Sequence, residues 1–147
     1  MIKEIRTILL VEDSDADAEM TIDALRQAKL ANPIVHVEDG VEALDYLFAR
    51  GDFADQANVI PAVVLLDIKM PRLDGIEVLR EIRNSEKHKH VPVVILSSSR
   101  EETDLARSWD LGVNAYVVKP VNALQFFDAV QMLGQFWAVM NESRPGN

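Results

Sequence analysis

Five short hydrophobic runs rich in β-branched residues recur along the chain, separated by segments with helical periodicity. We predict that these runs are strands, at TILLV (7–11), IVHVE (34–38), AVVLLD (62–67), VPVVIL (91–96) and AYVVK (115–119). Between them apolar residues return every three or four positions, as Ile76, Leu79 and Ile82 do, which is typical of helices. Apolar strands alternating with helices indicate a parallel sheet covered on both faces. The pattern therefore predicts an α/β fold with a doubly wound five-stranded sheet.

Length and composition indicate one domain without a membrane segment. The chain has 147 residues, enough to bury a core, and no cysteine, so a metal would need oxygen or histidine ligands. No apolar run approaches the roughly 18 residues of a membrane span, and no signal peptide is recognisable. We expect a cytoplasmic protein whose single domain spans residues 1–147, with a core at about 6–133 and a helix extension and polar tail at about 134–147.

The net charge argues against binding to nucleic acid. The sequence has 24 acidic against 15 basic residues, a formal charge of −9. A domain that neutralises phosphates over a broad surface needs the opposite sign. We therefore expect neither nucleic acid nor a membrane among its partners.

Acidic side chains stand at the ends of the first and third predicted strands. Glu12 and Asp13 directly follow the first strand, and Asp67 ends the third. In doubly wound sheets ligands bind at the carboxyl ends of strands, so the three carboxylates should meet there. Two unit charges about 4 Å apart repel by roughly 4 kcal/mol at an effective dielectric of about 20, so the cluster needs a cation, and Mg²⁺ suits carboxylates with an open side for phosphate. Alternatively the acidic pair caps the next helix, with Ser14 or Asp15 as the N-cap.

A hydroxyl and an amine end the fourth and fifth predicted strands. Ser97 follows the fourth strand, and Lys119 ends the fifth, just before Pro120. A transferring phosphoryl group spreads negative charge over three oxygens, so its transfer needs a metal and hydrogen-bond donors around it. Taken singly each residue is more often ordinary loop chemistry, but together they suit phosphoryl transfer.

Four separated motifs resemble the receiver domains of two-component response regulators. They are LLVEDS (9–14), VVLLDIKMPRLDG (63–75), VPVVILSSS (91–99) and GVNAYVVKP (112–120). The resemblance spans about 6 to 133 and implies a flavodoxin-like sheet with strand order 2-1-3-4-5 and a cis peptide bond before Pro120. Glu12 stands where many members have Asp, and Ser97 where many have Thr, so both keep the functional group.

The resemblance also implies a role for each candidate residue. Asp67 would accept a phosphoryl group from a histidine kinase, and Lys119 would bind that group. The implied Mg²⁺ ligands are Glu12, Asp13, Asp67 and the carbonyl of Lys69. Beyond this self-catalysed phosphorylation and its slow reversal, no enzyme activity is expected.

A conformational switch is the further implication of the resemblance. Ser97 would turn to a phosphoryl oxygen and Tyr116 into the vacated space, which would remodel the face of the fourth helix, fifth strand and fifth helix. Taken alone, Tyr116 is an ordinary half-buried strand residue.

The alternative to a phosphorylated switch is a pseudo-receiver that only binds proteins. A haloacid dehalogenase phosphatase is disfavoured because Asp67-Ile68-Lys69 lacks a second acid.

The last helical segment carries a second apolar stripe. The pattern runs from about 122 to 141. We expect no output domain beyond residue 147, and therefore output by protein contact. The stripe recurs at alternating spacings of four and three, at Phe126, Val130, Leu133, Trp137 and Met140. We predict a homodimer through it, with a core role equally open for Phe126 and Val130. Leu124 and Phe127 are expected to face the sheet.

Two predicted loops have unusual sequences. The stretch 49–61 is longer than most α/β connections, and with the long last helix it resembles regulators paired with phytochrome-type histidine kinases. His88 and His90 lie among lysines in EKHKHVP, which favours a solvated loop over a metal site.

Overall fold

A five-stranded parallel sheet lies at the centre of the protein. The computed structural model describes residues 6–131 except 29, 31, 56–59 and 71. Its strands are β1 (Ile8–Val11), β2 (Ile34–Val37), β3 (Val63–Asp67), β4 (Val93–Ser97) and β5 (Ala115–Val118). They pair in parallel in the order β2-β1-β3-β4-β5. The predicted α/β class, the five strands and their order are therefore confirmed.

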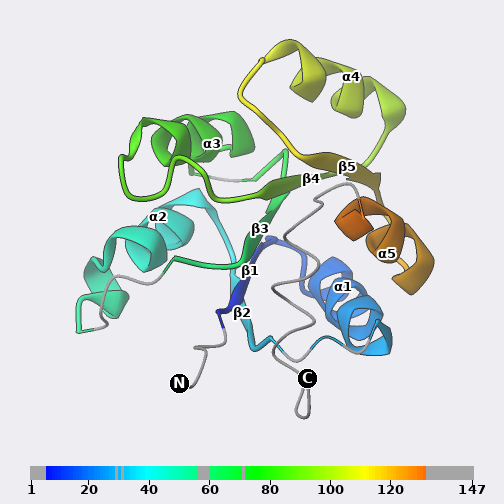
Figure 1. Ribbon diagram of the computed structural model, residues 1–147, viewed down its shortest axis with the longest axis horizontal. Helices are drawn as coiled ribbons and strands as arrows, with labels where there is room; N and C mark the ends of the chain where they lie inside the picture. Colours follow the sequence, from blue (N-terminus) through cyan, green and yellow to red (C-terminus); the bar gives the residue numbers. More distant parts are fainter. Residues whose placement is uncertain (1–5, 29, 31, 56–59, 71, 132–147) are drawn as a thin grey trace.

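Helices cover both faces of this sheet (Figure 1). They are α1 (Asp15–Gln27), α2 (Gly40–Phe48), α3 (Gly75–Asn84), α4 (Arg100–Ser108) and α5 (Ala123–Gln131). Helices α1 and α5 pack on one face, while α2, α3 and α4 pack on the other. The long loop at 49–61 contains a short 3₁₀ helix, η1 (Gly51–Phe53). None of the described helices combines the length and the apolar character needed to cross a membrane.

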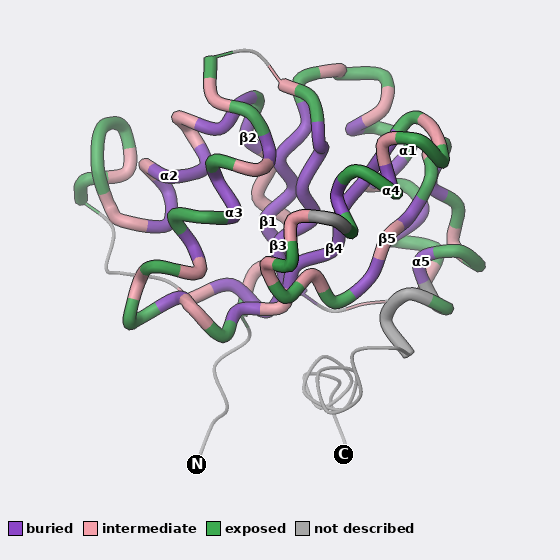
Figure 2. Tube along the Cα trace, turned by 90° about the horizontal axis from the view of Figure 1, so that it is seen from above, coloured by how far each residue is buried: buried purple, intermediate pink, exposed green. Residues whose placement is uncertain are grey.

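Alternate residues of the inner strands fill two separate cores. In β1, Ile8 and Leu10 belong to the core beneath α1 and α5, whereas Leu9 and Val11 belong to the core beneath α2 and α3. All four side chains are fully buried, and Figure 2 shows the central strands as a buried band. Strands buried on both faces need continuous apolar runs, which is the pattern that the sequence displays.

Capping side chains start all five α-helices directly behind strand ends and loops. The side chains of five residues each accept the backbone N–H of the residue three positions further on: Ser14, Asp39, Asp74, Ser99 and Asn122. Such a cap satisfies one of the backbone donors left open at a helix start. Ser14 is thus the N-cap among the two residues that the sequence left open, and α1 begins directly behind the acidic pair.

Helix α5 turns a different face to the sheet from the one expected. Phe126 is 1% exposed and packs in the core with Val117 and Val121, so the structure supports the core role that was left open for it. Leu124, expected to face the sheet, is 70% exposed, and that prediction is wrong. At 3.6 residues per turn these two side chains lie about 200° apart around the helix, so burial of one exposes the other.

The predicted dimer stripe is only partly within the described residues. Leu133, Trp137 and Met140 lie outside them, together with the predicted extension of the helix to about 141 and the side chains of Val130 and Phe127. Phe126 is the stripe residue whose side chain is placed. Its burial in the core of one chain removes it from the surface available to a second copy.

The loop before β4 also differs from its prediction. His88 is 1% exposed rather than solvated, while His90 is exposed. The His88 ring packs edge-on against Phe48, with the ring centroids 5.1 Å apart, and its Nδ1 lies 2.8 Å from the Ser85 hydroxyl oxygen. The turn that follows α3 directs this one side chain inward, so the charged neighbours in the sequence were a poor guide to its burial.

Candidate functional site

Three carboxylates converge at the carboxyl ends of β1 and β3. Val11 pairs with Leu66 across these strands, which brings Glu12 level with Asp67. One carboxylate oxygen from each of Glu12, Asp13 and Asp67 lies within 4.8 Å of the others. Glu12 and Asp67 are 0% and 3% exposed, while Asp13 is open to solvent. The structure therefore brings together the three carboxylates that the sequence placed at strand ends.

Lys119 reaches into this cluster from the end of β5. Its Nζ lies 3.1 Å from Glu12 Oε1, 3.2 Å from Asp67 Oδ2 and 3.0 Å from Asp17 Oδ2. The side chain is only 13% exposed, and the Lys119–Pro120 peptide bond is cis, as the resemblance implied. Asp17 was not anticipated. It could have been suspected because the Ser14 cap places it in the first turn of α1, next to the same sheet edge.

The cluster holds more negative charge than Lys119 balances. Burial, reinforced by the hydrogen bond to Asp67 and its charge, raises the pKa of Glu12 to about 8. Burial alone would lower the pKa of Lys119, but its hydrogen bond to Asp17 and the charges of Asp67 and Glu12 raise it above its usual value. Lys119 therefore stays protonated, and the surplus of oxygen ligands fits a hard divalent cation such as Mg²⁺.

The loop after β3 brings Lys69 beside Asp67. The backbone N–H of Lys69 donates to Asp67 Oδ1 at 3.2 Å, and its exposed ammonium pairs with Glu102 of α4 at 3.3 Å. A Cβ added at Gly75 would lie 2.7 Å from the carbonyl oxygen of Asp67, so this position needs glycine. The Lys69 carbonyl, the further predicted metal ligand, belongs to this tightly packed loop.

The part of the same loop that contains Arg72 and Leu73 contacts the start of α2. Arg72 Nη2 lies 2.7 Å from Oδ2 of Asp39, and Nε donates to the same oxygen at 2.9 Å. Burial opposes ionisation of Asp39, but the N–H of Glu42 and the guanidinium of Arg72 outweigh it and lower its pKa. A Cβ at Gly40 would overlap the Leu73 carbonyl oxygen, so loop and helix are in direct contact.

The two predicted switch residues lie toward α4. The Ser97 hydroxyl is fully buried, 2.6 Å from the hydroxyl oxygen of Thr103. Tyr116 is half-buried, with the Arg107 guanidinium 4.3 Å from its ring centroid. Burial raises the pKa of Tyr116, against the opposing charge of Arg107. Thr103 was missed by the sequence analysis, since a threonine in a polar helix carries no signal of its own.

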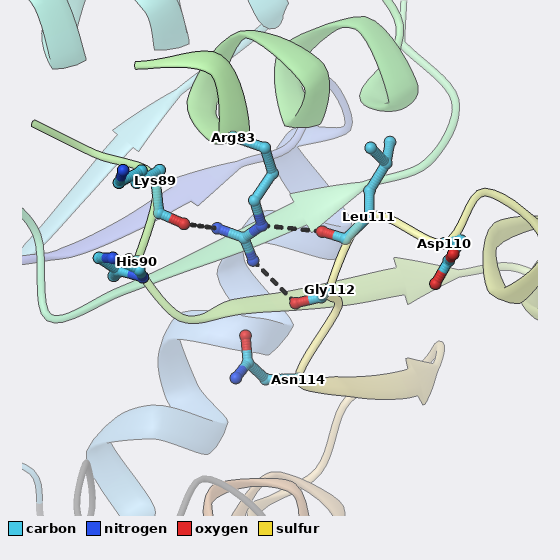
Figure 3. Close-up of a pocket in the computed structure, with 7 residues that line it drawn as sticks. All are labelled: Arg83, Lys89, His90, Asp110, Leu111, Gly112 and Asn114. Atoms are coloured by element: carbon cyan, nitrogen blue, oxygen red, sulfur yellow. Dashed lines mark hydrogen bonds between the residues drawn. The ribbon is translucent and has the colours of Figure 1, made fainter. Parts of the chain in front are cut away.

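A cavity of about 450 Å³ lies at the opposite edge of the sheet, beside the amino ends of β4 and β5 (Figure 3). Its lining comes from the end of α3 and from the loops that precede β4 and β5. Arg83 forms its wall, and all three of its guanidinium nitrogens donate to backbone carbonyls. Nε donates to Leu111, Nη2 donates to Gly112, and Nη1 donates to both Lys89 and Val91. This arginine joins two loops, so we interpret the cavity as structural and separate from the acidic cluster.

A family model described as the response regulator receiver domain matches residues 8–131. The match covers most of the chain and all of the residues that surround Asp67. The chain therefore belongs to the receiver domains of response regulators, which are in general signalling proteins rather than enzymes.

Two bacteriophytochrome response regulators of known structure are similar over nearly the whole chain. AtBRR is 55% identical, with a TM-score of 0.88, over 95% of this chain and 99% of its own. RtBRR is 51% identical, with a TM-score of 0.89, over 97% of this chain and 86% of its own. The predicted resemblance to response regulators of phytochromes is thereby confirmed.

Response regulator Rcp1 of Synechocystis sp. is a more distant relative. It is 36% identical over 132 residues, which cover 90% of this chain and 88% of Rcp1. The Mn(2+)-bound form of Rcp1 has been solved and matches with a TM-score of 0.71. A divalent metal is thus present in a structure of one relative.

Proposed function

We propose that this protein is a phosphorylation-dependent switch in which Asp67 accepts a phosphoryl group from a histidine kinase with the help of Mg²⁺. The observation that carries the proposal is the contact of Lys119 Nζ with Asp67 Oδ2 at 3.2 Å, within a cluster of carboxylates. Such an arrangement places a nucleophilic carboxylate beside a fixed cation, with surplus negative charge left for a metal. A pseudo-receiver would have no need for these charges.

The transfer itself requires little covalent chemistry from the protein. A carboxylate oxygen of Asp67 attacks the phosphorus of a phosphohistidine, the P–N bond breaks, and the imidazole of the kinase leaves with the bonding electrons. Lys119 offsets negative charge on the transferring group. Mg²⁺ would be held by Glu12, Asp13, Asp67 and the Lys69 carbonyl, and when bound it would supply further charge compensation. The product is an aspartyl phosphate.

The output is proposed to run through the face of α4, β5 and α5. Ser97 turns toward a phosphoryl oxygen, and Tyr116 moves into the space that it leaves. Large apolar side chains are exposed on each of the three elements: Leu105 of α4 is 55% exposed, Val118 of β5 38% and Leu124 of α5 70%. Exposed apolar groups on consecutive elements favour signalling by protein contact.

The proposed partners follow from the same similarities. A phytochrome-type histidine kinase is favoured because two of the similar structures are bacteriophytochrome response regulators. A homodimer through the last helix would use the remaining stripe of Val130, Leu133, Trp137 and Met140. We place this function in the cytoplasm, without nucleic acid or membrane partners, in keeping with the net charge of −9.

Intact-mass spectrometry after incubation with phosphoramidate tests the proposal. We expect one added phosphoryl group on the wild type in the presence of Mg²⁺, and none after chelation of the metal or on Asp67→Asn. Asp74→Asn is the matched control, since Asp74 follows in the same loop but caps α3. Wild-type protein without an adduct under any condition would favour the pseudo-receiver, and an adduct on Asp67→Asn would refute Asp67 as the acceptor.

A further inference from the structure

A buried pair of hydroxyls joins the end of β4 to the first turns of α4. Ser97 Oγ and Thr103 Oγ1 are 2.6 Å apart, toward the short end of the range for O–H···O hydrogen bonds. The two residues are 0% and 6% exposed. Because water has little access to either hydroxyl, their hydrogen bonds must be made to neighbouring protein groups. The contact is therefore expected to influence which way Ser97 points.

The protons of this pair can be assigned from a second contact. Thr103 Oγ1 also donates to the backbone carbonyl oxygen of Ser99 at 3.2 Å. A carbonyl can only accept, and a hydroxyl has a single proton. We assign the Thr103 proton to the Ser99 carbonyl, which can only accept, and in this assignment Ser97 donates its own proton to Thr103.

A phosphoryl group on Asp67 would compete for that same Ser97 proton. Asp67 ends β3 and is paired with Leu96, the residue before Ser97 on the neighbouring strand. Phosphoryl oxygens accept hydrogen bonds and do not donate them. Ser97 can therefore donate to Thr103 or to the phosphoryl group, but not to both.

We propose that Thr103 is a positioning residue that holds the Ser97 hydroxyl in its unphosphorylated orientation by accepting its only proton. This inference rests on the proposed function, because it concerns the response of Ser97 to the group on Asp67. Phosphorylation succeeds in recruiting Ser97 only by breaking the Ser97–Thr103 bond. The strength of that bond then sets how readily the protein enters its phosphorylated conformation.

The same bond carries the state of Asp67 to α4. Thr103 lies next to Glu102, which accepts the N–H of Ser98 at 2.8 Å and pairs with Lys69 of the loop after β3. The start of α4 is thus held to the site by the Lys69–Glu102 ion pair, by the hydrogen bond from Ser98 to Glu102 and by the Ser97 hydroxyl. When Ser97 leaves Thr103, one of these three contacts is lost, and α4 is freer to shift on the face that carries Leu105.

Binding of beryllofluoride, a non-covalent mimic of the phosphoryl group, tests the inference on the full chain. The apparent dissociation constant would be measured by ¹⁹F NMR at saturating Mg²⁺ for wild type, Thr103→Val and Thr103→Ser. We expect Thr103→Val to bind about fivefold more tightly, the size that one net hydrogen bond of ordinary strength allows. Thr103→Ser keeps the hydroxyl and should bind like the wild type.

A double-mutant cycle separates this role from a general effect on packing. In a Ser97→Ala background there is no Ser97 proton to compete for, so Thr103→Val should leave the affinity unchanged. A fivefold gain that persists in this background would overturn the inference. If Thr103→Val does not fold, as judged by thermal unfolding, Thr103→Ala removes the same hydroxyl and is judged by the same criterion.

The outcomes distinguish this inference from the proposed function. Wild-type protein that does not bind beryllofluoride would overturn both. Wild-type binding with equal or weaker binding by Thr103→Val would overturn the role of Thr103 and leave the phosphorylation switch intact. Tighter binding that disappears in the Ser97→Ala background would establish Thr103 as the competing acceptor.

Discussion

Each edge of the sheet contains a half-buried cation, but the two cations have different surroundings. At the carboxyl edge, Lys119 lies among the carboxylates of Glu12, Asp17 and Asp67. At the amino edge, Arg83 is surrounded by neutral backbone carbonyls, and burial lowers its pKa. The carboxylates instead raise the pKa of Lys119. One cation is thus held by charge and the other by hydrogen bonds.

This difference separates a reactive site from a structural one. The hydrogen-bond donors of Arg83 are directed at fixed acceptors on two loops, and that environment keeps no net negative charge for a ligand. The environment of Lys119 keeps a surplus of negative charge that a proton on Glu12 or a metal ion must offset. A charge imbalance that persists in a buried site, rather than burial of a charge alone, therefore marks the reactive edge.

Removal of the cation at the carboxyl edge should have the largest effect. Lys119→Met is expected to slow phosphoryl transfer to Asp67 by roughly 10²- to 10³-fold, the usual effect of removing one preorganised charge or donor. The rate would be followed by mass spectrometry with phosphoramidate and Mg²⁺. Lys89→Met, at the opposite edge, is the matched control and should retain the wild-type rate. Equal rates for both variants would remove the distinction between the edges.

Removal of the cation at the amino edge should affect stability instead. Arg83→Met leaves several backbone carbonyls without their donor, which is expected to cost about 2 kcal/mol in the free energy of unfolding. Urea denaturation measures this loss, with Arg80→Met as a control because Arg80 is exposed on the same helix. The variant should still be phosphorylated on Asp67. A variant as stable as wild type would show that the arginine does not hold the loops together.

The metal requirement gives a smaller and more specific effect. Because Mg²⁺ would bind the folded protein only, a concentration of about 100 times Kd should stabilise it by about 2.7 kcal/mol. Asp13→Asn should weaken binding roughly tenfold and so lower that stabilisation by about 1.4 kcal/mol. Asp15→Asn, two residues further on and exposed, should respond like the wild type. Thermal unfolding with and without Mg²⁺ measures this stabilisation. If Asp13→Asn gained as much stability from Mg²⁺ as wild type, the assignment of Asp13 as a metal ligand would be contradicted.

The ion pair between Arg72 and Asp39 should have the smallest effect. The Arg72 side chain is 56% exposed, so Arg72→Gln is expected to cost less than about 1 kcal/mol. Since the folded pKa of Asp39 lies below its ordinary value of 3.8, the stability from this pair is present above that pH and is lost as the pH falls through the folded pKa. The free energy of unfolding of Arg72→Gln should therefore fall less steeply with decreasing pH than that of wild type. Identical acid transitions would exclude a contribution from this pair.

Much of the fold and of the acidic cluster could be predicted from the sequence alone. Apolar runs set the strands, and parallel strands bring their carboxyl ends to one edge, so Glu12, Asp13 and Asp67 had to approach one another. The resemblance to receiver domains added the strand order and the cis peptide bond before Pro120. These features depend on the order of elements along the chain, which periodicity reveals.

The partners of individual side chains were decided only by the tertiary structure. Nothing in the sequence links Asp17 to Lys119, which are 102 positions apart, or the hydroxyl of Ser97 to that of Thr103. The orientation of α5 about its axis likewise decided that Phe126 is buried and Leu124 exposed. Periodicity identifies an apolar helix face, but the rotation of a helix and the direction of a side chain depend on packing against distant elements. For that reason the sequence determined which chemical groups meet at the sheet edge, and the fold determined which of them touch.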